Sequence, residues 1–305
     1  MGRLEAMQVF ATVASTGGFA AAARRLGTSP PAVTRTIAAL EKRLGTRLLH
    51  RTTRVVRLTD AGERFLADCR RLLAEIDDAE AAAAGVHAEL RGALAVTAPA
   101  MFGRLHVAPV VLEFLRSHPL VEIRTLFVDR IVNLLDEGLD VAVRIAPLPD
   151  SSLTATRVGS VRRMVCAAPS YLAAHGTPVE PAELTKHDVV SLTGLTPSPG
   201  WTFAAGDGRV TVPVTPRLST NLPDVALDAA RAGHGLTMLL SYQVAADLEA
   251  GRLVAVLVEW EPPPLPIHVV HGAGRRPSAR VRAFVDHAVA ALRPFDTALH
   301  GGHAR

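Results

Sequence analysis

The stretch FAAAARRLGTSPPAVTRTIAALEKRLG, residues 19–45, decides how the first part of this 305-residue chain folds. It predicts two helices, over residues 19–26 and from Pro30 onward, because apolar residues recur at helical spacing on both sides of Gly27. Gly27 suits the position just past the first helix, where a positive φ is often required. Ser29 can cap the second helix, and Pro30 fits its first position because the missing N–H needs no partner there.

A polar and basic face runs along the second of these helices. Its apolar residues repeat at spacings of four, three and four and share one side: Val33, Ile37, Leu40 and Leu44. The other side carries Pro31, Thr34, Arg35, Ala38 and Lys42. A helix with small polar and basic side chains can enter the major groove of DNA and reach base edges or phosphates. An ordinary helical subdomain with a hairpin is the alternative.

The residues on either side complete the pattern of a winged helix-turn-helix. Residues 4–14 carry an apolar stripe at helical spacing, and Gly17-Gly18 ends that helix. After Gly45, apolar and basic residues alternate towards Leu58, which predicts two short strands joined by a basic tip. The first part of the chain is therefore predicted to be a three-helix unit with a β-wing.

The positive charge of the chain is concentrated in this first part. Residues 1–58 contain ten Lys and Arg residues against two acidic ones, whereas residues 59–91 contain four against eight. The remaining 214 residues hold 19 of each sign. A compact basic segment on a neutral body predicts a polyanionic partner for that segment alone. A solvated basic surface would have the same composition and is the alternative.

A long helix is predicted to begin at Asp60, with Thr59 as its cap. Apolar residues then alternate at spacings of four and three over 25 residues: Phe65, Cys69, Leu72, Ile76, Ala79, Ala83, Val86 and Leu90. This 3.5-residue period is typical of a coiled coil, so we expect a dimerisation helix of about 30 residues that is broken at Gly92. Cys69 is expected to be a small buried side chain in this seam, with a redox role as the alternative.

Six stretches together resemble the N-terminal domain of the LysR-type transcriptional regulators. They are Phe10-Ala11-Thr12-Val13-Ala14, Ala20-Ala21-Ala22-Ala23-Arg24-Arg25-Leu26, Ser29-Pro30-Pro31-Ala32-Val33-Thr34-Arg35-Thr36-Ile37, Leu40-Glu41-Lys42-Arg43-Leu44-Gly45, Arg47-Leu48-Leu49-His50-Arg51 and Leu58-Thr59-Asp60-Ala61-Gly62. The likeness is specific over residues 4–66 and continues more weakly to about residue 295. It implies a two-lobed periplasmic-binding-protein-like effector domain and a homotetramer built as a dimer of dimers. The apolar seam by itself indicates only a dimer.

The resemblance also implies which side chains contact DNA. In the family the residue after the Ser29 equivalent is very often Gln and contacts a base, whereas Pro30 offers no hydrogen-bond donor. The Thr34 equivalent is usually Ser, Arg35 matches, and the position of Thr36 is often Gln. Base reading is therefore expected to be thinner than usual and to rely partly on DNA shape. The candidate DNA-binding residues are Ser29, Pro30, Pro31, Thr34, Arg35 and Thr36, with Arg51, Thr52 and Arg54 in the wing.

Beyond Gly92 the pattern predicts an α/β body. Strands and helices alternate in the first part of this body, which predicts βαβ units and a parallel sheet: strand 94–98, helix 102–117, strand 121–128, helix 131–137 and strand 139–145. Two crossing segments lead into a second lobe, and a late strand and helix return to the first: segments 153–158 and 163–168, strand 267–270 and helix 280–292.

The expected fold class is α/β with an N-terminal all-α winged helix-turn-helix and a long linker helix. We expect three domains: the head (residues 1–59), the linker or dimerisation helix (residues 60–91) and an effector-binding domain (residues 92–300). Within the last of these, lobe I is expected at about 92–161 and 266–300, and lobe II at about 162–265.

A small-molecule effector is expected between the lobes, because ligands of open α/β sheets bind at the carboxyl ends of strands, near helix N-termini. The candidate effector-binding residues are Ala98, Pro99, Ala100, Met101, Phe102, Arg144, Asn221, Leu222 and Asp224. In the family the Met101 equivalent is often Ser or Thr and bonds an effector carboxylate, so we expect a bulkier or more apolar effector here. Core packing is the alternative role for Met101 and Phe102. Arg144 can pair with an anionic ligand or cap a neighbouring carbonyl.

Other chemistries lack their motifs. Only two cysteines occur, which excludes a disulfide framework. No metal site or cofactor is expected, because His268 and His271 would point to opposite faces of a strand. Gly233-His234-Gly235 lacks the third glycine of a dinucleotide fingerprint, and no Walker-type lysine loop or G-x-S-x-G elbow occurs. No membrane span or signal peptide is recognisable, so a cytoplasmic protein without a membrane partner is expected.

These features predict a transcriptional regulator that binds double-stranded operator DNA and is tuned by a small molecule of unknown identity. Paired heads predict inverted half-sites about one helical turn apart. A small-molecule binding protein whose head attaches non-specifically to polyanions is the second hypothesis. An enzyme on an α/β scaffold is the third, and the sequence offers it no nucleophile, base or metal constellation.

Overall fold

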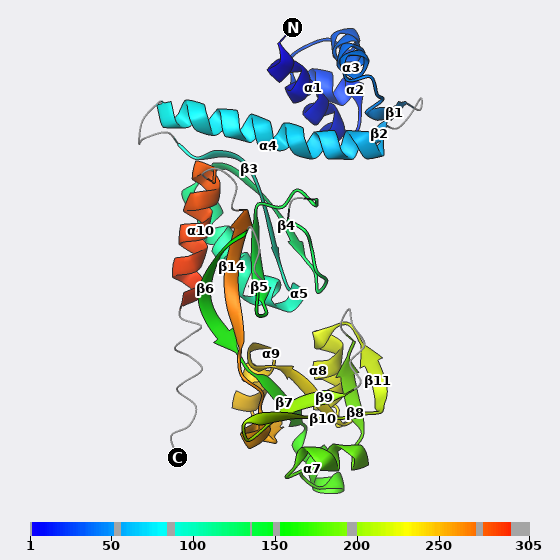
Figure 1. The fold of residues 1–305 in the computed structure, drawn as a ribbon, viewed down its shortest axis with the longest axis vertical. Helices are drawn as coiled ribbons and strands as arrows, with labels where there is room; N and C mark the ends of the chain where they lie inside the picture. Colours follow the sequence, from blue (N-terminus) through cyan, green and yellow to red (C-terminus); the bar gives the residue numbers. More distant parts are fainter. Residues whose placement is uncertain are drawn as a thin grey trace.

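The computed structural model describes residues 2–51, 56–83, 89–134, 136–148, 153–193, 200–272 and 277–293. The helical head, one long helix and two α/β lobes follow one another in the chain (Figure 1). The predicted wing residues Thr52 and Arg54 and the seam residue Val86 lie outside the described residues, as does the side chain of Arg51.

The head has the predicted winged helix-turn-helix fold. Its elements are α1 (Arg3–Thr16), α2 (Phe19–Arg25), α3 (Pro30–Leu44), β1 (Leu49–Arg51) and β2 (Val56–Leu58), and the two strands pair antiparallel. Gly27 has a φ of +62°, as the turn between α2 and α3 requires. The helices share one core in which Phe10, Val13 and Ile37 have no exposed surface.

The first part of the long helix α4 (Asp60–Ala83) packs against the head. Phe65 packs against the core of the head with its ring centroid 5.5 Å from that of Phe10, and Cys69 is fully buried in the same core. Burial raises the pKa of the Cys69 thiol to about 12, which leaves it protonated and inert. The prediction that the whole seam faces a partner helix is therefore wrong for its first two positions, because an amphipathic repeat does not say what covers it.

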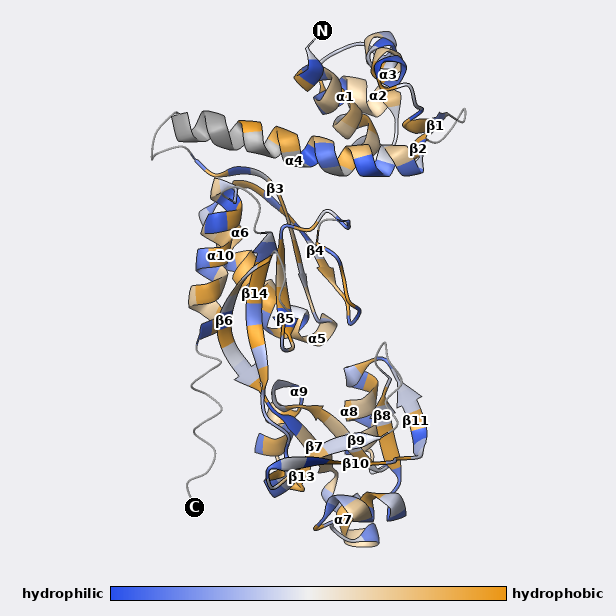
Figure 2. Ribbon diagram, viewed as in Figure 1, coloured by the Kyte–Doolittle hydropathy of each residue, from blue (hydrophilic) through white to orange (hydrophobic). Residues whose placement is uncertain are grey.

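Further along the seam Leu72 and Ile76 are partly exposed, whereas Leu90 lies beyond the end of α4 and packs against the core of lobe I, so its prediction as a seam residue is wrong. Leu72 is 37% exposed and Ile76 is half-buried. Blue and orange alternate along the coloured part of α4 in Figure 2, as in an amphipathic helix. The apolar side of α4 thus continues past the point where the head stops covering it.

Lobe I is built on a five-stranded sheet in the order β4-β3-β5-β14-β6. Its elements are β3 (Arg91–Ala98), α5 (Ala100–Phe102), a π-helical turn η1 (Gly103–Val107), α6 (Ala108–Ser117), β4 (Leu120–Phe127), β5 (Val141–Ile145), β6 (Leu153–Val161), β14 (Leu265–Gly272) and α10 (Ala279–Leu292). Phe114 of α6 and Phe284 of α10 pack edge to face in the core on one side of the sheet. Val132, Leu134 and Leu139 cover the other side.

Lobe II has a second five-stranded sheet in the order β11-β8-β12-β7-β13, with a separate β9-β10 hairpin. Its elements are β7 (Arg163–Ala167), α7 (Pro169–His175), a 3-10 turn η2 (Pro181–Lys186), β8 (Val189–Leu192), β9 (Trp201–Ala205), β10 (Gly208–Val212), β11 (Pro216–Thr220), α8 (Pro223–Arg231), β12 (Leu236–Leu240), α9 (Ser241–Glu249), β13 (Val254–Val256) and a 3-10 turn η3 (Val258–Trp260). Two apolar clusters occupy the two sides of this sheet.

The chain crosses between the lobes twice. Arg162 lies at the first crossing, where its backbone N–H donates to the Ser241 hydroxyl at 3.1 Å and its carbonyl accepts from the Ser241 N–H at 2.9 Å. Its guanidinium also pairs with Glu261, at 3.3 Å, on the return segment. Both crossings are thus tied to each other and to the start of α9.

Three expectations for the body are corrected. Both sheets are mixed, since β14 runs antiparallel to β5 and β6, and β7 runs antiparallel to β12 and β13. A strand next to a crossing between the lobes, β14 in lobe I and β7 in lobe II, runs against its neighbours in each sheet, which local sequence cannot reveal. The predicted helix 131–137 is a series of turns where it is described, and β3 begins at Arg91 rather than at Leu94.

No single helix in the described part of the chain is long and apolar enough to cross a lipid bilayer. Helices α1 and α2 reach that length and composition only as a pair, and the two are bent by 119° at the turn between them.

Candidate functional site

The first turn of α3 is capped by the chain itself. The Ser29 hydroxyl accepts from the N–H of Ala32 at 3.4 Å, as the sequence predicts. Pro30 and Pro31 follow, both exposed, and neither carries an N–H. Because a helix N-terminus binds phosphate through such N–H groups, this end of α3 has fewer donors to offer DNA than an ordinary helix.

The next turns of α3 carry three candidate DNA-binding residues, one of which is buried. Thr34 is half-buried, with its hydroxyl donating to the Pro30 carbonyl at 3.0 Å, and Arg35 is exposed. Thr36 is only 2% exposed, and its hydroxyl donates to the carbonyl of Ala32 at 2.9 Å. The prediction that Thr36 contacts DNA is therefore wrong, because the 3.6-residue period places it on the apolar side of α3.

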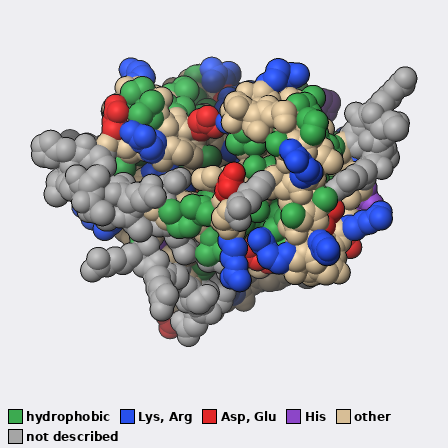
Figure 3. Space-filling view, turned by 90° about the horizontal axis from the view of Figure 1, so that it is seen from above, with side chains coloured by type: hydrophobic (Ala, Val, Ile, Leu, Met, Phe, Trp, Pro, Cys, Tyr) green, Lys and Arg blue, Asp and Glu red, His purple; other side chains and the backbone are tan. Residues whose placement is uncertain are grey.

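The basic side chains of the head are exposed. The Lys and Arg residues that the structure describes in the head with their side chains are all exposed: Arg3, Arg24, Arg25, Arg35, Lys42, Arg43, Arg47 and Arg57. Seen from above in Figure 3, Lys and Arg side chains are spread around the molecule with hydrophobic and acidic ones between them. Such a surface attracts a polyanion at long range and loses that attraction as salt rises.

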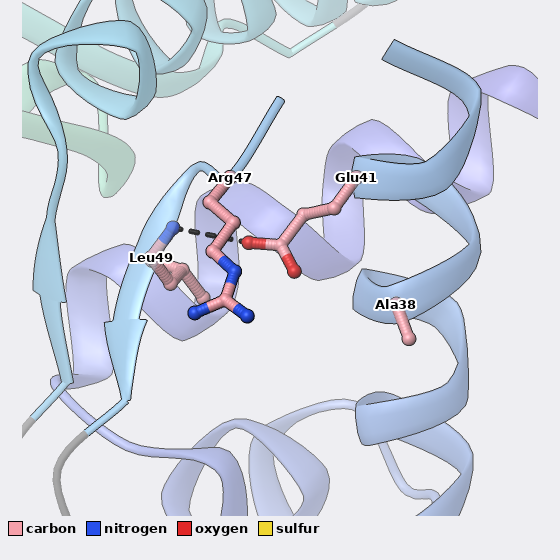
Figure 4. A pocket seen from close by; sticks show the side chains of 4 residues that line it. All are labelled: Ala38, Glu41, Arg47 and Leu49. Atoms are coloured by element: carbon pink, nitrogen blue, oxygen red, sulfur yellow. Dashed lines mark hydrogen bonds between the residues drawn. The ribbon is translucent and has the colours of Figure 1, made fainter. Parts of the chain in front are cut away.

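A small hollow separates α3 from the start of the wing. It has a volume of about 220 Å³ and is lined by Ala38, Glu41, Arg47 and Leu49 (Figure 4). One carboxylate oxygen of Glu41 accepts from the N–H groups of Leu48 and Leu49, at 2.9 and 3.1 Å. Sequence reasoning missed this site, although one signal was present: Glu41 is one of only two acidic residues in a strongly basic segment.

Three candidate effector residues, Met101, Phe102 and Asp224, contact the opposite lobe. Ala98 ends β3 and is buried, Pro99 is half-buried, and the N–H of Ala100 donates to the Asp129 carboxylate at 2.9 Å. Met101 is 5% exposed and packs in a lobe II cluster that includes Met164. The alternative role of core packing is thus the one that Met101 has in this structure.

Aromatic side chains continue the contact between the lobes. Phe102 of lobe I is fully buried and meets Tyr242 of lobe II edge to face, with ring centroids 5.2 Å apart. His106 lies 4.8 Å from Phe102 and 5.6 Å from Tyr242. Burial raises the pKa of Tyr242 and lowers the pKa of His106, so that both rings are held uncharged at neutral pH.

One ion pair also joins the lobes. Arg104 of lobe I lies 3.1 Å from the Asp224 carboxylate at the start of α8, and both side chains are more than half exposed. The neighbouring candidates Asn221 and Leu222 are exposed. Arg144 donates to the carbonyl of Val132 at 2.9 Å, which is the capping role that its sequence position allowed.

The structure therefore packs Met101 of lobe I into a lobe II cluster and pairs Arg104 with Asp224, whereas Arg144 is engaged within lobe I. It also adds Arg104, Asp129 and Tyr242, which sequence reasoning missed. Asp129 lies two residues beyond the end of β4, so the rule that places ligands at strand ends pointed to it as much as to Ala98.

A buried carboxylate anchors α8 from the opposite end. Asp247 of α9 is 1% exposed on its side chain and accepts from Arg231 at 2.7 and 2.5 Å and from Arg252 at 2.6 Å. The hydrogen bonds from these two guanidinium groups hold the pKa of Asp247 below its usual value. This network joins the C-terminal end of α8 to α9 and leaves the Asp224 end facing lobe I.

Comparisons with known proteins match both parts of the chain. The bacterial regulatory helix-turn-helix protein, lysR family, matches residues 4–63, and the LysR substrate binding domain matches residues 87–293. A helix-turn-helix-type transcriptional repressor of Pseudomonas aeruginosa is 35% identical over 288 residues, covering 94% of this chain and 91% of that protein. The Escherichia coli regulator DmlR is 32% identical over 284 residues, covering 93% and 92%.

Solved structures extend the likeness to the arrangement of the whole chain. CrgA, a LysR-type transcriptional regulator from Neisseria meningitidis, aligns with a TM-score of 0.61 at 29% identity, covering 96% of this chain and 99% of that one. The full-length virulence activator AphB of Vibrio cholerae aligns with a TM-score of 0.61 at 27% identity, covering 95% and 100%. With its N-terminal helix-turn-helix domain and its C-terminal substrate-binding domain, this chain belongs to the LysR family of DNA-binding transcriptional regulators.

Proposed function

We propose that the head recognises an operator by placing α3 in the major groove and the wing beside it. The observation that carries this proposal is the outward stripe of α3, formed by Pro31, Thr34, Arg35, Ala38 and Lys42, on a head whose described cations are exposed. The proposed DNA-binding residues are Ser29, Pro30, Pro31, Thr34 and Arg35 on α3 and Arg51, Thr52 and Arg54 in the wing.

The division of the chain supports a paired arrangement. We propose domains at residues 1–59, 60–91 and 92–300, with lobe I at about 92–161 and 266–300 and lobe II at about 162–265. The outward seam of α4 from Leu72 onward would join two chains and present two heads to inverted half-sites about one helical turn apart. A homotetramer would then be a dimer of such dimers.

The region between the lobes is the proposed effector site. LysR-type regulators respond to small molecules, and residues 98–102 with Asn221, Leu222 and Asp224 are the groups proposed to contact one here. Effector binding would change how the lobes meet, and α4 would pass the change to the spacing of the heads. We propose that the chain acts on DNA in the cytoplasm and has no catalytic activity of its own.

The test of DNA recognition is a fluorescence-anisotropy titration of the full chain at physiological salt. DNA from upstream of its own gene is compared with a scrambled sequence of the same composition. A regulator is expected to prefer its operator by about 10³-fold or more. Equal, strongly salt-dependent binding, both here and in a selection from random sequences, would instead support non-specific attachment to polyanions.

A matched pair of variants tests how α3 reads DNA. Thr34→Ala is expected to change sequence preference, because Thr34 lies on the outward stripe, with a cost of about 1 kcal/mol at the affected base pair. Thr36→Val, which keeps the buried shape, is expected to leave preference unchanged. A selection from random DNA measures both, and unchanged preference in Thr34→Ala would remove Thr34 from the bases.

A further inference from the structure

The start of the wing is attached to α3 through one side chain. We define the wing root as residues 47–49, the three residues that lead into β1. Glu41 lies on α3 and binds the N–H groups of Leu48 and Leu49 through a single oxygen, at 2.9 and 3.1 Å. Hydrogen bonds to a charged acceptor are stronger than neutral ones, so the root has a well-defined place beside α3.

The same root is attached to α4 through its carbonyl groups. The Thr59 hydroxyl donates to the Arg47 carbonyl at 2.7 Å and accepts from the N–H of Gly62 at 3.0 Å, while the Thr59 N–H donates to the Leu48 carbonyl at 3.0 Å. A Cβ on Gly62 would lie 2.0 Å from that carbonyl oxygen, so only glycine lets α4 approach so closely. The root is thus held from both sides.

Arg47 is the residue that this attachment presents to solvent. Its backbone is held by Thr59, and its exposed side chain lines the hollow of about 220 Å³ between α3 and the root (Figure 4). The opposite wall of the hollow is Ala38, which lies one turn from Thr34 and one turn from Lys42 on the outward stripe. The hollow therefore opens on the face of the head that carries the proposed DNA-reading residues.

DNA geometry places a phosphate backbone at this position. The major groove is about 12 Å wide, which is close to the diameter of an α-helix with its side chains. A helix in the groove therefore has phosphates directly along its flank, on the side where the wing begins. Ala38 is small enough to leave that flank open, and Arg47 supplies the cation.

We infer that Arg47 contacts a backbone phosphate beside α3 and that Glu41 is the positioning residue that holds the wing root for this contact. The inference rests on the proposed docking of α3 in the major groove. Glu41 does not touch the DNA: its carboxylate binds the backbone of the root, and its effect on affinity passes through Arg47.

The first experiment measures the salt dependence of binding to random-sequence DNA with the full chain. Arg47→Ala should weaken binding about fivefold at 0.15 M salt and reduce the slope of log affinity against log salt by about 0.9, the value for one phosphate contact. Arg3→Ala removes an exposed cation at the start of α1 and should leave the slope unchanged. An unchanged slope in Arg47→Ala overturns the phosphate contact.

The second experiment separates positioning from charge and from stability. Glu41→Ala should weaken binding and make the further loss from Arg47→Ala smaller than it is in the wild type. Glu41→Gln keeps an oxygen that accepts the same two N–H groups, so it should bind DNA at least as well as the wild type. Independent, multiplying effects of Glu41→Ala and Arg47→Ala, or failure of Glu41→Gln to restore binding, overturn the positioning role.

These outcomes are distinct from a failure of the proposed function. Random DNA reports on Arg47 even if no operator is found, because a phosphate contact carries no sequence information. A wild type without operator preference would contradict sequence-specific regulation. The salt slope of Arg47→Ala on random DNA would still test the phosphate contact. Thermal unfolding of each variant identifies any loss of binding that comes only from an unfolded head.

Discussion

The exposed face of α3 and the contact between the lobes differ in how many contacts their side chains make with other residues of the same chain. On α3, Arg35 is exposed, and the stripe around it faces solvent. Between the lobes, Met101 packs into the lobe II core, Arg104 pairs with Asp224, and Asp129 occupies the N–H of Ala100. The proposed DNA face is therefore preformed, whereas a ligand between the lobes would have to replace contacts that the protein makes with itself.

This difference has an energetic consequence. A preformed surface binds without first losing internal contacts, and its affinity depends mainly on charge and salt. A region filled by its own side chains binds a ligand only when the new contacts exceed the ones displaced, which couples binding to movement of the lobes. Such coupling is what a regulator needs in its effector domain and not in its DNA-binding surface.

The largest expected effect would show that the head and the two lobes unfold as separate units. Phe10→Ala removes a fully buried aromatic ring from the core of the head, at a cost of about 3–5 kcal/mol. The head should lose its unfolding transition and its DNA binding, while the lobes keep theirs. Phe203→Ala, 1% exposed in lobe II, should do the opposite. Calorimetry in which both transitions fall together in either variant would contradict separate units.

The next prediction concerns the lobe contact itself. Met101→Ala should cost about 2–5 kcal/mol and loosen the lobes, because Met101 reaches from lobe I into the core of lobe II. Met164→Ala, in the same cluster and also 5% exposed, should cost a similar amount without altering how the lobes meet. Small-angle scattering distinguishes the two variants. An identical radius of gyration in both would mean that Met101 does not hold the lobes together.

A pH-dependent effect of intermediate size is expected inside lobe II. The pKa of Asp247 lies below its ordinary value of 3.8 because Arg231 and Arg252 bind the charged form. This stabilisation is fully present above the unfolded-state pKa and is lost as pH falls through the folded-state pKa. Asp247→Asn should lower stability by about 2 kcal/mol at pH 7.

The acid limb of the stability curve tests the sign of this effect. Denaturant unfolding from pH 7 to pH 2 should show a smaller loss of stability in Asp247→Asn than in the wild type. Asp228→Asn, whose carboxylate is 71% exposed beside the same Arg231, is the matched control and should follow the wild type. Parallel curves for Asp247→Asn and the wild type would count against the assignment.

The smallest expected effect on stability belongs to the ion pair between the lobes. Arg104 and Asp224 are 60% and 56% exposed on their side chains, so Asp224→Asn should cost under about 1 kcal/mol. Its effect should appear instead in the separation of the lobes at low salt, measured by scattering, and vanish at high salt. A loss of several kcal/mol in the free energy of unfolding would show that the ion pair contributes to the stability of the fold and is more than a weak contact between the lobes.

Much of the head could be predicted because its signals are local. The cap at Ser29, the proline after it and the positive φ of Gly27 follow from the residues themselves, and the structure confirms each. Thr36 was misjudged because its resemblance to a base-contacting position outweighed the helical period that places it on the buried side. Glu41 was overlooked because its partners are backbone groups seven and eight residues away.

The sequence by itself determined the class of fold, the polar and basic outward face of α3 and the family, since caps, periodicity and charge are properties of neighbouring residues. Only the tertiary structure decided that Phe65 and Cys69 belong to the core of the head, that both sheets are mixed, and that Met101 fills lobe II from lobe I. The physical reason is that an apolar side chain lowers the free energy of the folded chain wherever it is buried. A hydrophobic pattern predicts that a residue is buried, and only the packing of distant segments decides which residues bury it.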